Sequence, residues 1–338
     1  MKLIYKRICC LVLLAMSLSL VVSCAGPSPT PTPAVLKVAL ALARGGLGDK
    51  AFNDGAYEGL QRAQTELGAQ VQAVEFKEGD EQIENLRQLA GEDYGLIIAL
   101  GAENATPLKT VAAEYPDKRF AIIDTTVDAP NVTSITFREL EGDFLAGALS
   151  ALLSKSGKVG FLGGADVTVI RRIEFGWKQG VQYVNPQAEI LSEYIGGKDD
   201  FSGFSKPEAG QSLTEQMYQQ GAELVYAAAG KSGLGAITAA QTQKKLIITT
   251  GSDQRWIAPE VVVTSRTKNM HYVVFTLVQE LQSGALQPGG RELDYKSGGI
   301  GLAPLATDLI PAEALTKFKE IQTDVESGKI KVEPYTGT

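Results

Sequence analysis

The chain has 338 residues, of which 44% are hydrophobic and 21% are charged, a composition typical of a globular protein. Its formal net charge of -7 argues against binding to nucleic acid or to an anionic membrane surface, since both need basic patches. A single histidine, His271, and three cysteines leave little for zinc chemistry or a histidine-based triad, so we predict neither an enzyme nor a cofactor.

Residues 1–23 have the pattern of a secretory signal, because basic residues at 2, 6 and 7 precede an apolar run over 8–22. That run is short for a membrane span. It ends in a small residue followed by Cys24, an order that resembles the bacterial lipobox, whose cysteine becomes the lipidated N-terminus. A spare cysteine and an uncleaved anchor are the alternatives. We expect Cys24 to anchor the protein through lipid on the extracytoplasmic face of the cell membrane.

A proline-rich spacer follows the cysteine, with proline at every second position over part of residues 25–34. Such a segment favours extended polyproline geometry and adds nothing to a packed core. We therefore expect residues 24–35 to be the lipidated cysteine and its tether. About 300 residues remain, enough for two domains of ordinary size.

The first folded stretch is an apolar run that leads into a glycine-rich turn and ends at Asp54. It predicts a strand over 36–42 and a helix over 54–67, capped by Asn53 or Asp54. Ligands bind at the carboxyl ends of strands in an open parallel sheet. The carboxylate of Asp49, the ring of Phe52 and the amide of Asn53 therefore predict a site for a small polar molecule with a flat face. An ordinary turn with a capping residue and a core aromatic is the alternative.

Further apolar runs alternate with amphipathic segments along the rest of the chain. We expect strands over 70–75, 95–100, 119–124, 158–162, 188–195, 224–228, 246–250 and 261–264, and helices over 80–90, 104–115, 141–153, 167–184, 207–220, 270–282 and 311–328. The runs lack polar alternation, as strands covered on both faces require. This pattern predicts an α/β fold with parallel, doubly wound sheets in two halves. We expect lobe 1 to hold 36–130 and 251–285, and lobe 2 to hold 131–250 and 286–338.

Polar residues recur where the predicted strands end. Asp124 closes an apolar strand, Gly230 begins a glycine-rich turn, and Asp253 follows the strand over 246–250. Each has an ordinary alternative as a residue that shapes its loop. Two halves joined by short bridges imply a cleft that these strand ends would line.

The order of these motifs resembles that of the basic membrane protein family of substrate-binding lipoproteins, whose best understood members are purine nucleoside receptors that feed ABC importers. The similarity covers about residues 36–305. It rests on eight motifs in register: 48–53, 122–124, 141–147, 171–186, 230–235, 252–254, 264–268 and 301–304. It implies a two-lobed periplasmic-binding-protein fold of type I, with Rossmann-like parallel sheets and three hinge crossings. It also implies a monomer that captures a small molecule and passes it to an ABC permease.

The resemblance further implies a purine held between two aromatic rings. One ring is Phe52 and the other is Phe204, with Phe201 as its alternative. Asp49, Asn53 and Asp124 would lie in the same cleft, the last two facing the base, and the ribose would be held by Gly230, Asp253 and Lys268. If the three aspartates converge, their charges should favour nucleosides over nucleotides.

Two residues depart from the family pattern. Lys206 stands where the family usually has aspartate, and Arg266 is a second local departure. A sugar or another small signalling molecule is therefore an alternative ligand. A nucleoside-processing enzyme is a further alternative, since it would share the same pocket.

Overall fold

The computed structural model describes residues 36–75 and 82–337, and these residues form two six-stranded sheets. The first sheet has the order β11 (Gly289–Leu293), β5 (Val132–Phe137), β4 (Phe120–Ile123), β3 (Leu96–Leu100), β1 (Lys37–Ala41) and β2 (Gln70–Val74), all paired in parallel. The second has the order β12 (Ile300–Leu302), β10 (Val262–Lys268), β9 (Leu246–Gly251), β8 (Leu224–Ala228), β6 (Lys158–Asp166) and β7 (Glu189–Lys198). Its strands are parallel except for β12, which is antiparallel to β10. The signal segment, Cys24 and the tether lie outside the described residues.

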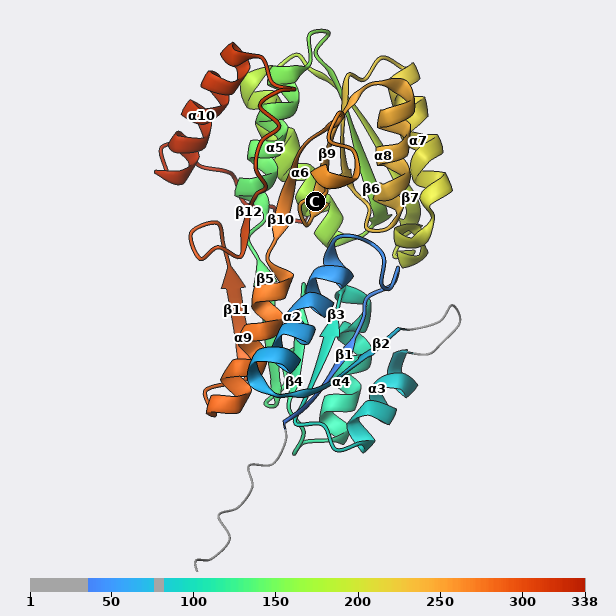
Figure 1. The fold of residues 1–338 in the computed structure, drawn as a ribbon, viewed down its shortest axis with the longest axis vertical. Helices are drawn as coiled ribbons and strands as arrows, with labels where there is room; N and C mark the ends of the chain where they lie inside the picture. The colour runs from blue at the N-terminus through green and yellow to red at the C-terminus, as the bar shows by residue number, and fades with distance from the viewer. Residues whose placement is uncertain (1–35, 76–81, 338) are drawn as a thin grey trace, which may run out of the picture. The chain divides into compact units, whose positions relative to one another are not determined.

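Lobe 1 is the first sheet with helices on both of its faces (Figure 1). Its helices are α2 (Phe52–Leu67), α3 (Gln82–Gly91), α4 (Ala105–Glu114) and α9 (Met270–Ser283), with a short turn η1 (Ala102–Asn104) before α4. Alternate residues of β1 enter opposite cores: Val38 and Leu40 pack with α2 and α9, whereas Ala39 and Ala41 pack with α3 and α4. This two-sided burial explains why β1 is apolar at every position.

Lobe 2 repeats the arrangement around the second sheet. Its helices are α5 (Leu140–Leu153), α6 (Thr168–Val184), α7 (Pro207–Gln219), α8 (Ser232–Gln243) and α10 (Ala312–Glu326), with short turns η2 (Phe201–Ser205) and η3 (Arg255–Ile257). Phe161 of β6 packs among residues of α5, α6 and α10, and its neighbour Leu162 packs among residues of α7 and α8. The predicted α/β, doubly wound architecture with two lobes is confirmed.

The chain crosses between the two sheets three times, as predicted, but at other residues than the sequence suggested. The crossings follow β5, β10 and β11. Three segments change lobe relative to the expected boundaries of 130, 250 and 285. β5 pairs with β4 in lobe 1, β10 pairs with β9 in lobe 2, and β11 pairs with β5 in lobe 1.

Two of these strands were not predicted as strands. β5 falls outside the strands expected from the sequence, although its residues from Val132 to Phe137 are rich in β-branched side chains. β11 begins with two glycines and contains two charged residues, a composition that gives little local preference for a strand. It forms at the sheet edge because β5 supplies its pairing partner. For β11, pairing with a neighbouring strand therefore outweighs the weak local preference of its sequence.

Ion pairs tie the three crossings together. Arg138, just after β5, lies 3.2 Å from Asp294, just after β11. Glu139, one residue further on, is fully buried and lies 3.0 Å from Lys268, the last residue of β10. These two pairs hold the hinge segments of both lobes to one another.

Candidate ligand-binding site

A pocket lies where strands of both sheets end. It is lined from lobe 1 by Ala43, Arg44, Asp49, Ala51, Phe52, Asn53, Gly101, Ala102, Glu103 and Asp124, and from lobe 2 by Val169, Ile170, Ile173, Phe201, Phe204, Ala228, Gly230, Thr250, Gly251, Arg266 and Lys268. Of the predicted binding residues, only Asp253 is missing from this lining. Both candidates for the second aromatic ring are present.

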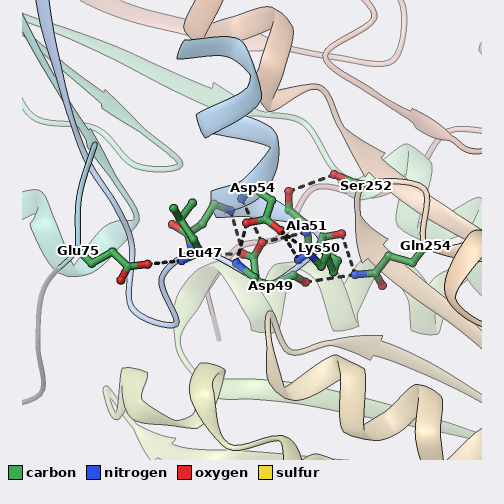
Figure 2. Close-up of polar contacts among 10 residues, drawn as sticks. Leu47, Asp49, Lys50, Ala51, Asp54, Glu75, Ser252 and Gln254 are labelled. Atoms are coloured by element: carbon green, nitrogen blue, oxygen red, sulfur yellow. Dashed lines mark hydrogen bonds and ion pairs between the residues drawn. The ribbon is translucent and has the colours of Figure 1, made fainter. Parts of the chain in front are cut away.

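The Asp49 loop, residues 42–51, is organised by buried hydrogen bonds (Figure 2). The carboxylate of Asp49 accepts from the main-chain N–H groups of Ala51 and Asn53, both at 2.9 Å, and of Asp54 at 3.1 Å. Burial raises the pKa of Asp49, an effect that these N–H donors oppose. Because its oxygens serve the loop, Asp49 shapes the pocket rather than offering a free carboxylate to it.

The start of α2 differs from our prediction. We expected Asn53 or Asp54 to cap the helix, but α2 begins at Phe52. The carboxylate of Asp49 accepts hydrogen bonds from the first main-chain N–H groups of the helix. Asn53 instead accepts from the N–H of Ala43 at 2.9 Å, which fixes the end of the strand before the turn. Asp54 accepts from Gly48 and Lys50 in the turn itself.

Asp124 and Lys268 meet on the floor of the pocket. Asp124 has a φ of +82°, a conformation that is uncommon for residues other than glycine. Its Oδ1 atom accepts from Lys268 Nζ at 2.5 Å. The same Nζ pairs with Glu139, and Arg172 pairs with Glu139 from the other side at 2.9 Å. Burial works to raise the pKa of Glu139, but the charges of Lys268 and Arg172 lower it overall.

Aromatic rings line the pocket from both lobes. Phe52, at the start of α2, has the ammonium group of Lys268 at 5.6 Å from its ring centroid. Phe201 and Phe204 of η2 lie with centroids 6.4 Å apart and planes inclined by 33°. The Phe204 ring lies against Gly164, where an added Cβ would come within 2.3 Å of it. Gly230 also adjoins this ring and so packs against it, while its contact with ribose stays a prediction.

Asp253 lies away from the pocket. Its side chain is exposed and accepts from the N–H of Arg255 at 3.0 Å. Gly251, two residues earlier, has a φ of +103°, and Thr250 and Gly251 line the pocket in its place. The expected convergence of three aspartate charges therefore does not occur, because Asp253 is outside and Asp49 is engaged by its own loop.

The segment after β9 joins lobe 2 to the Asp49 loop (Figure 2). Ser252 Oγ donates to the carbonyl oxygen of Ala51 at 3.0 Å. Gln254 Nε2 donates to the carbonyl oxygen of Lys50 at 3.0 Å and to that of Asp49 at 3.4 Å. Lys268, which donates to Asp124, also joins the two lobes. We call the bonds of Ser252 and Gln254 the interlobe bonds; both donors are side chains that bind main-chain oxygens.

Three charged residues that line the pocket were not predicted as ligand contacts: Arg44, Glu103 and Arg266. Glu103 accepts from the N–H of Arg44 at 2.9 Å, and burial raises the pKa of Glu103. Arg266, which we noted only as a departure from the family pattern, is 1% exposed. Glu103 comes three residues after the end of an apolar strand, and the sequence indicates a polar group at this strand end without assigning it a ligand contact. Lys206, the other departure, is exposed and is not part of the lining.

Within residues 36–75 and 82–337, no group of His, Cys, Asp and Glu side chains is arranged to hold a metal ion. No helix in this part of the chain has the length and apolar character needed to span a membrane.

Comparison with known proteins identifies the family. Residues 36–333 match the model of the Bmp family, described as PnrA-like ABC transporter substrate-binding proteins. Basic membrane protein A of Borreliella afzelii is 30% identical over 307 residues, which cover 88% of this chain and 91% of that protein. An uncharacterized lipoprotein of Pyrococcus furiosus is 30% identical over 311 residues, covering 87% of this chain and 74% of that protein.

The fold has a close structural counterpart. A crystal structure of an ABC transporter solute-binding protein from Aeropyrum pernix K1 superposes with a TM-score of 0.81 at 26% identity, covering 89% of this chain and 94% of that one. The resemblance drawn from the eight motifs is thereby confirmed. The chain belongs to the Bmp family of PnrA-like substrate-binding proteins of ABC transporters and has their two-lobed type I fold.

Proposed function

We propose that this protein captures a purine nucleoside between its lobes and delivers it to an ABC permease. The observation that carries the proposal is that Phe52 of lobe 1 lines the same pocket as Phe201 and Phe204 of lobe 2. A purine stacked on such a ring gains roughly 1–3 kcal/mol, largely independent of which base it is. Membership of the substrate-binding family supports delivery to a permease.

Polar residues of lobe 1 would then read the edge of the base. Asp124 and Asn53 line the pocket beside Phe52, and Asp124 offers its second carboxylate oxygen as an acceptor. Asn53, whose amide also binds Ala43 and Asp49, offers its remaining N–H as a donor. The charged residues of the lining balance, with Arg44, Arg266 and Lys268 against Asp49, Glu103 and Asp124. A ligand without net charge leaves this balance intact. We therefore keep the prediction of nucleosides over nucleotides, on the basis of charge balance rather than repulsion by three aspartates.

The remaining parts of the proposal concern the cell. Lipid on Cys24 would hold the protein at the extracytoplasmic face of the membrane, and the proline-rich tether would let the lobes reach the permease. We propose that it acts as a monomer and performs no chemistry on its ligand. Cys24→Ser should move the protein from the membrane fraction to the medium or periplasm. Incubation with inosine should release no hypoxanthine.

Calorimetry with a defined panel tests the ligand. We expect inosine, guanosine or adenosine to bind more tightly than hypoxanthine, D-ribose or inosine 5′-monophosphate. Phe52→Ala should weaken nucleoside binding, whereas Phe175→Ala, which removes an aromatic ring outside the pocket, should not. Tighter binding of D-ribose than of every nucleoside would replace this proposal with a sugar-binding function. Release of hypoxanthine from inosine would instead favour the enzyme.

A further inference from the structure

Arg266 is a buried cation whose Nε atom is held by two neighbouring side chains. It lies on β10, and its Nε atom donates to Asp143 Oδ1 of α5 at 2.8 Å. The hydroxyl of Tyr226 on β8 donates to the same Oδ1 at 2.6 Å and lies 3.4 Å from Nε. Asp143 and Tyr226 are not part of the pocket lining, whereas Arg266 is. The two partners therefore hold the guanidinium at Nε, and Arg266 is the member of this group that lines the pocket.

The outer nitrogens of Arg266 are available as donors. A guanidinium has five N–H groups. Among the described residues, every side-chain hydrogen bond of Arg266 uses Nε, so the four N–H groups on its Nη atoms have no protein acceptor. When a ligand displaces water from the pocket, these groups need acceptor atoms on the ligand.

Thr250 supplies the complementary group beside it. Thr250 and Arg266 are direct partners in the parallel register of β9 and β10, and both line the pocket. The hydroxyl of Thr250 donates to the carbonyl oxygen of Ala227 at 3.1 Å, so its oxygen is left to accept. A donor and an acceptor side by side match hydroxyl groups, which both accept and donate.

Lobe 2 offers few other polar side chains to a ligand. Besides Thr250 and Arg266, the polar side chain that it contributes to the lining is Lys268, whose ammonium group already pairs with Asp124 and Glu139. Asp253, expected to hold the sugar, lies outside the lining. The lobe 2 side of the pocket therefore depends on Thr250 and Arg266 for direct hydrogen bonding by side chains.

We propose that Arg266 and Thr250 form a hydroxyl-binding subsite, in which Arg266 donates to and Thr250 accepts from the vicinal hydroxyl groups of a ribose. The identity of the sugar rests on the proposed function. The subsite itself rests on the contacts of the two side chains. It makes Arg266 a specificity-determining residue of the pocket.

The test compares inosine with 2′,3′-dideoxyinosine by calorimetry. We expect the wild-type protein to bind inosine at least about tenfold more tightly, which corresponds to about 1.4 kcal/mol. Arg266→Lys keeps a cation beside Asp143 but removes the forked donors, and Thr250→Val removes the acceptor at nearly constant volume. Both variants should reduce the ratio of the two affinities to below about threefold. Arg291→Lys, at an arginine paired with Glu280 outside the pocket, should keep the wild-type ratio.

The outcomes separate this inference from the proposed function. If inosine binds and its preference over the dideoxy compound survives in both variants, the subsite is wrong and the nucleoside function stands. If inosine does not bind, the nucleoside function is wrong, and D-ribose against 2-deoxy-D-ribose becomes the comparison. A preference for D-ribose that Arg266→Lys abolishes would support the subsite. No binding of D-ribose to the wild-type protein would overturn the subsite as well.

Discussion

Removing the interlobe bonds of Ser252 and Gln254 should favour an open form, in which the lobes separate, over the closed form, in which these bonds hold them together. Ser252 and Gln254 make two bonds of 3.0 Å to the Asp49 loop, and a third of 3.4 Å that contributes little. At about 1 kcal/mol net for each good bond, Ser252→Ala with Gln254→Ala should cost the closed form about 2 kcal/mol. This corresponds to roughly a 30-fold change in the ratio of closed to open molecules.

Two measurements would report this change. Small-angle scattering of the ligand-free protein should give a larger radius of gyration for the double variant. Calorimetry should give weaker apparent binding of inosine, because only closed molecules make contacts from both lobes. Gly251→Ala should act in the same direction, since its added Cβ would come within 2.6 Å of Ala51 Cβ.

A matched control removes similar side chains that bond within one lobe. Gln241 donates to Glu260 in lobe 2, and Ser283 donates to Glu280 in lobe 1. Gln241→Ala with Ser283→Ala should leave both measurements unchanged. If the radius of gyration and the inosine affinity of the Ser252→Ala, Gln254→Ala variant also stay at wild-type values, the assigned role of the interlobe bonds is wrong.

Three further predictions follow from the pocket and its supporting charges. Phe52→Ala should weaken inosine binding by roughly 1–3 kcal/mol in calorimetry, while Phe52→Tyr should retain most of the affinity. Lys268→Met should lower the free energy of urea unfolding by about 3–5 kcal/mol, because it removes a buried partner of Glu139, and adding Glu139→Gln should restore part of the loss. Burial raises the pKa of Asp143 from 3.8 to about 6 against the opposing charge of Arg266. The folded state therefore keeps a proton that the unfolded state releases. The stabilisation due to this proton is about 3 kcal/mol; it is full below pH 3.8 and is lost as the pH rises through 6.

Each of these predictions has a contrary result. Equal inosine affinity for Phe52→Ala and wild-type protein would remove the stacking role of that ring. An unfolding free energy unchanged by Lys268→Met would show that Arg172 alone satisfies Glu139. For Asp143, the unfolding free energy of the wild type should decrease relative to that of Asp143→Asn as the pH rises from 4 to 6. A difference independent of pH would contradict the raised pKa.

Local sequence was enough to predict the parts of the pocket that belong to one strand and the turn after it. The apolar run of β1, the glycines behind it and the polar residues that follow occur together in the chain, so Asp49, Phe52 and Asn53 could be placed at a strand end. Asp124 was predicted for the same reason, because it directly follows β4.

Features that depend on turn geometry or on distant partners could not be predicted in this way. Asp253 and Gly251 are both close to the end of β9, and the sequence does not tell which of them lines the pocket; Gly251, with a φ of +103°, is the one that does. Arg266 is buried because Asp143, 123 residues away, and Tyr226, 40 residues away, accept or share its hydrogen bonds. The strand β11 likewise depends on pairing with β5, which lies far from it in the chain.

The interlobe bonds also bear on how this pocket could change in evolution or by design. Ser252 and Gln254 recognise only carbonyl oxygens, which every amino acid at positions 49–51 would provide. The side chain at position 50 takes no part in these bonds, but its φ of +53° favours glycine, asparagine or aspartate there, whereas position 51 must stay small beside Gly251. Ligand preference and lobe closure are thus separately adjustable, and a library randomised at Phe52, which lines the pocket, should yield altered selectivity in proteins that still close.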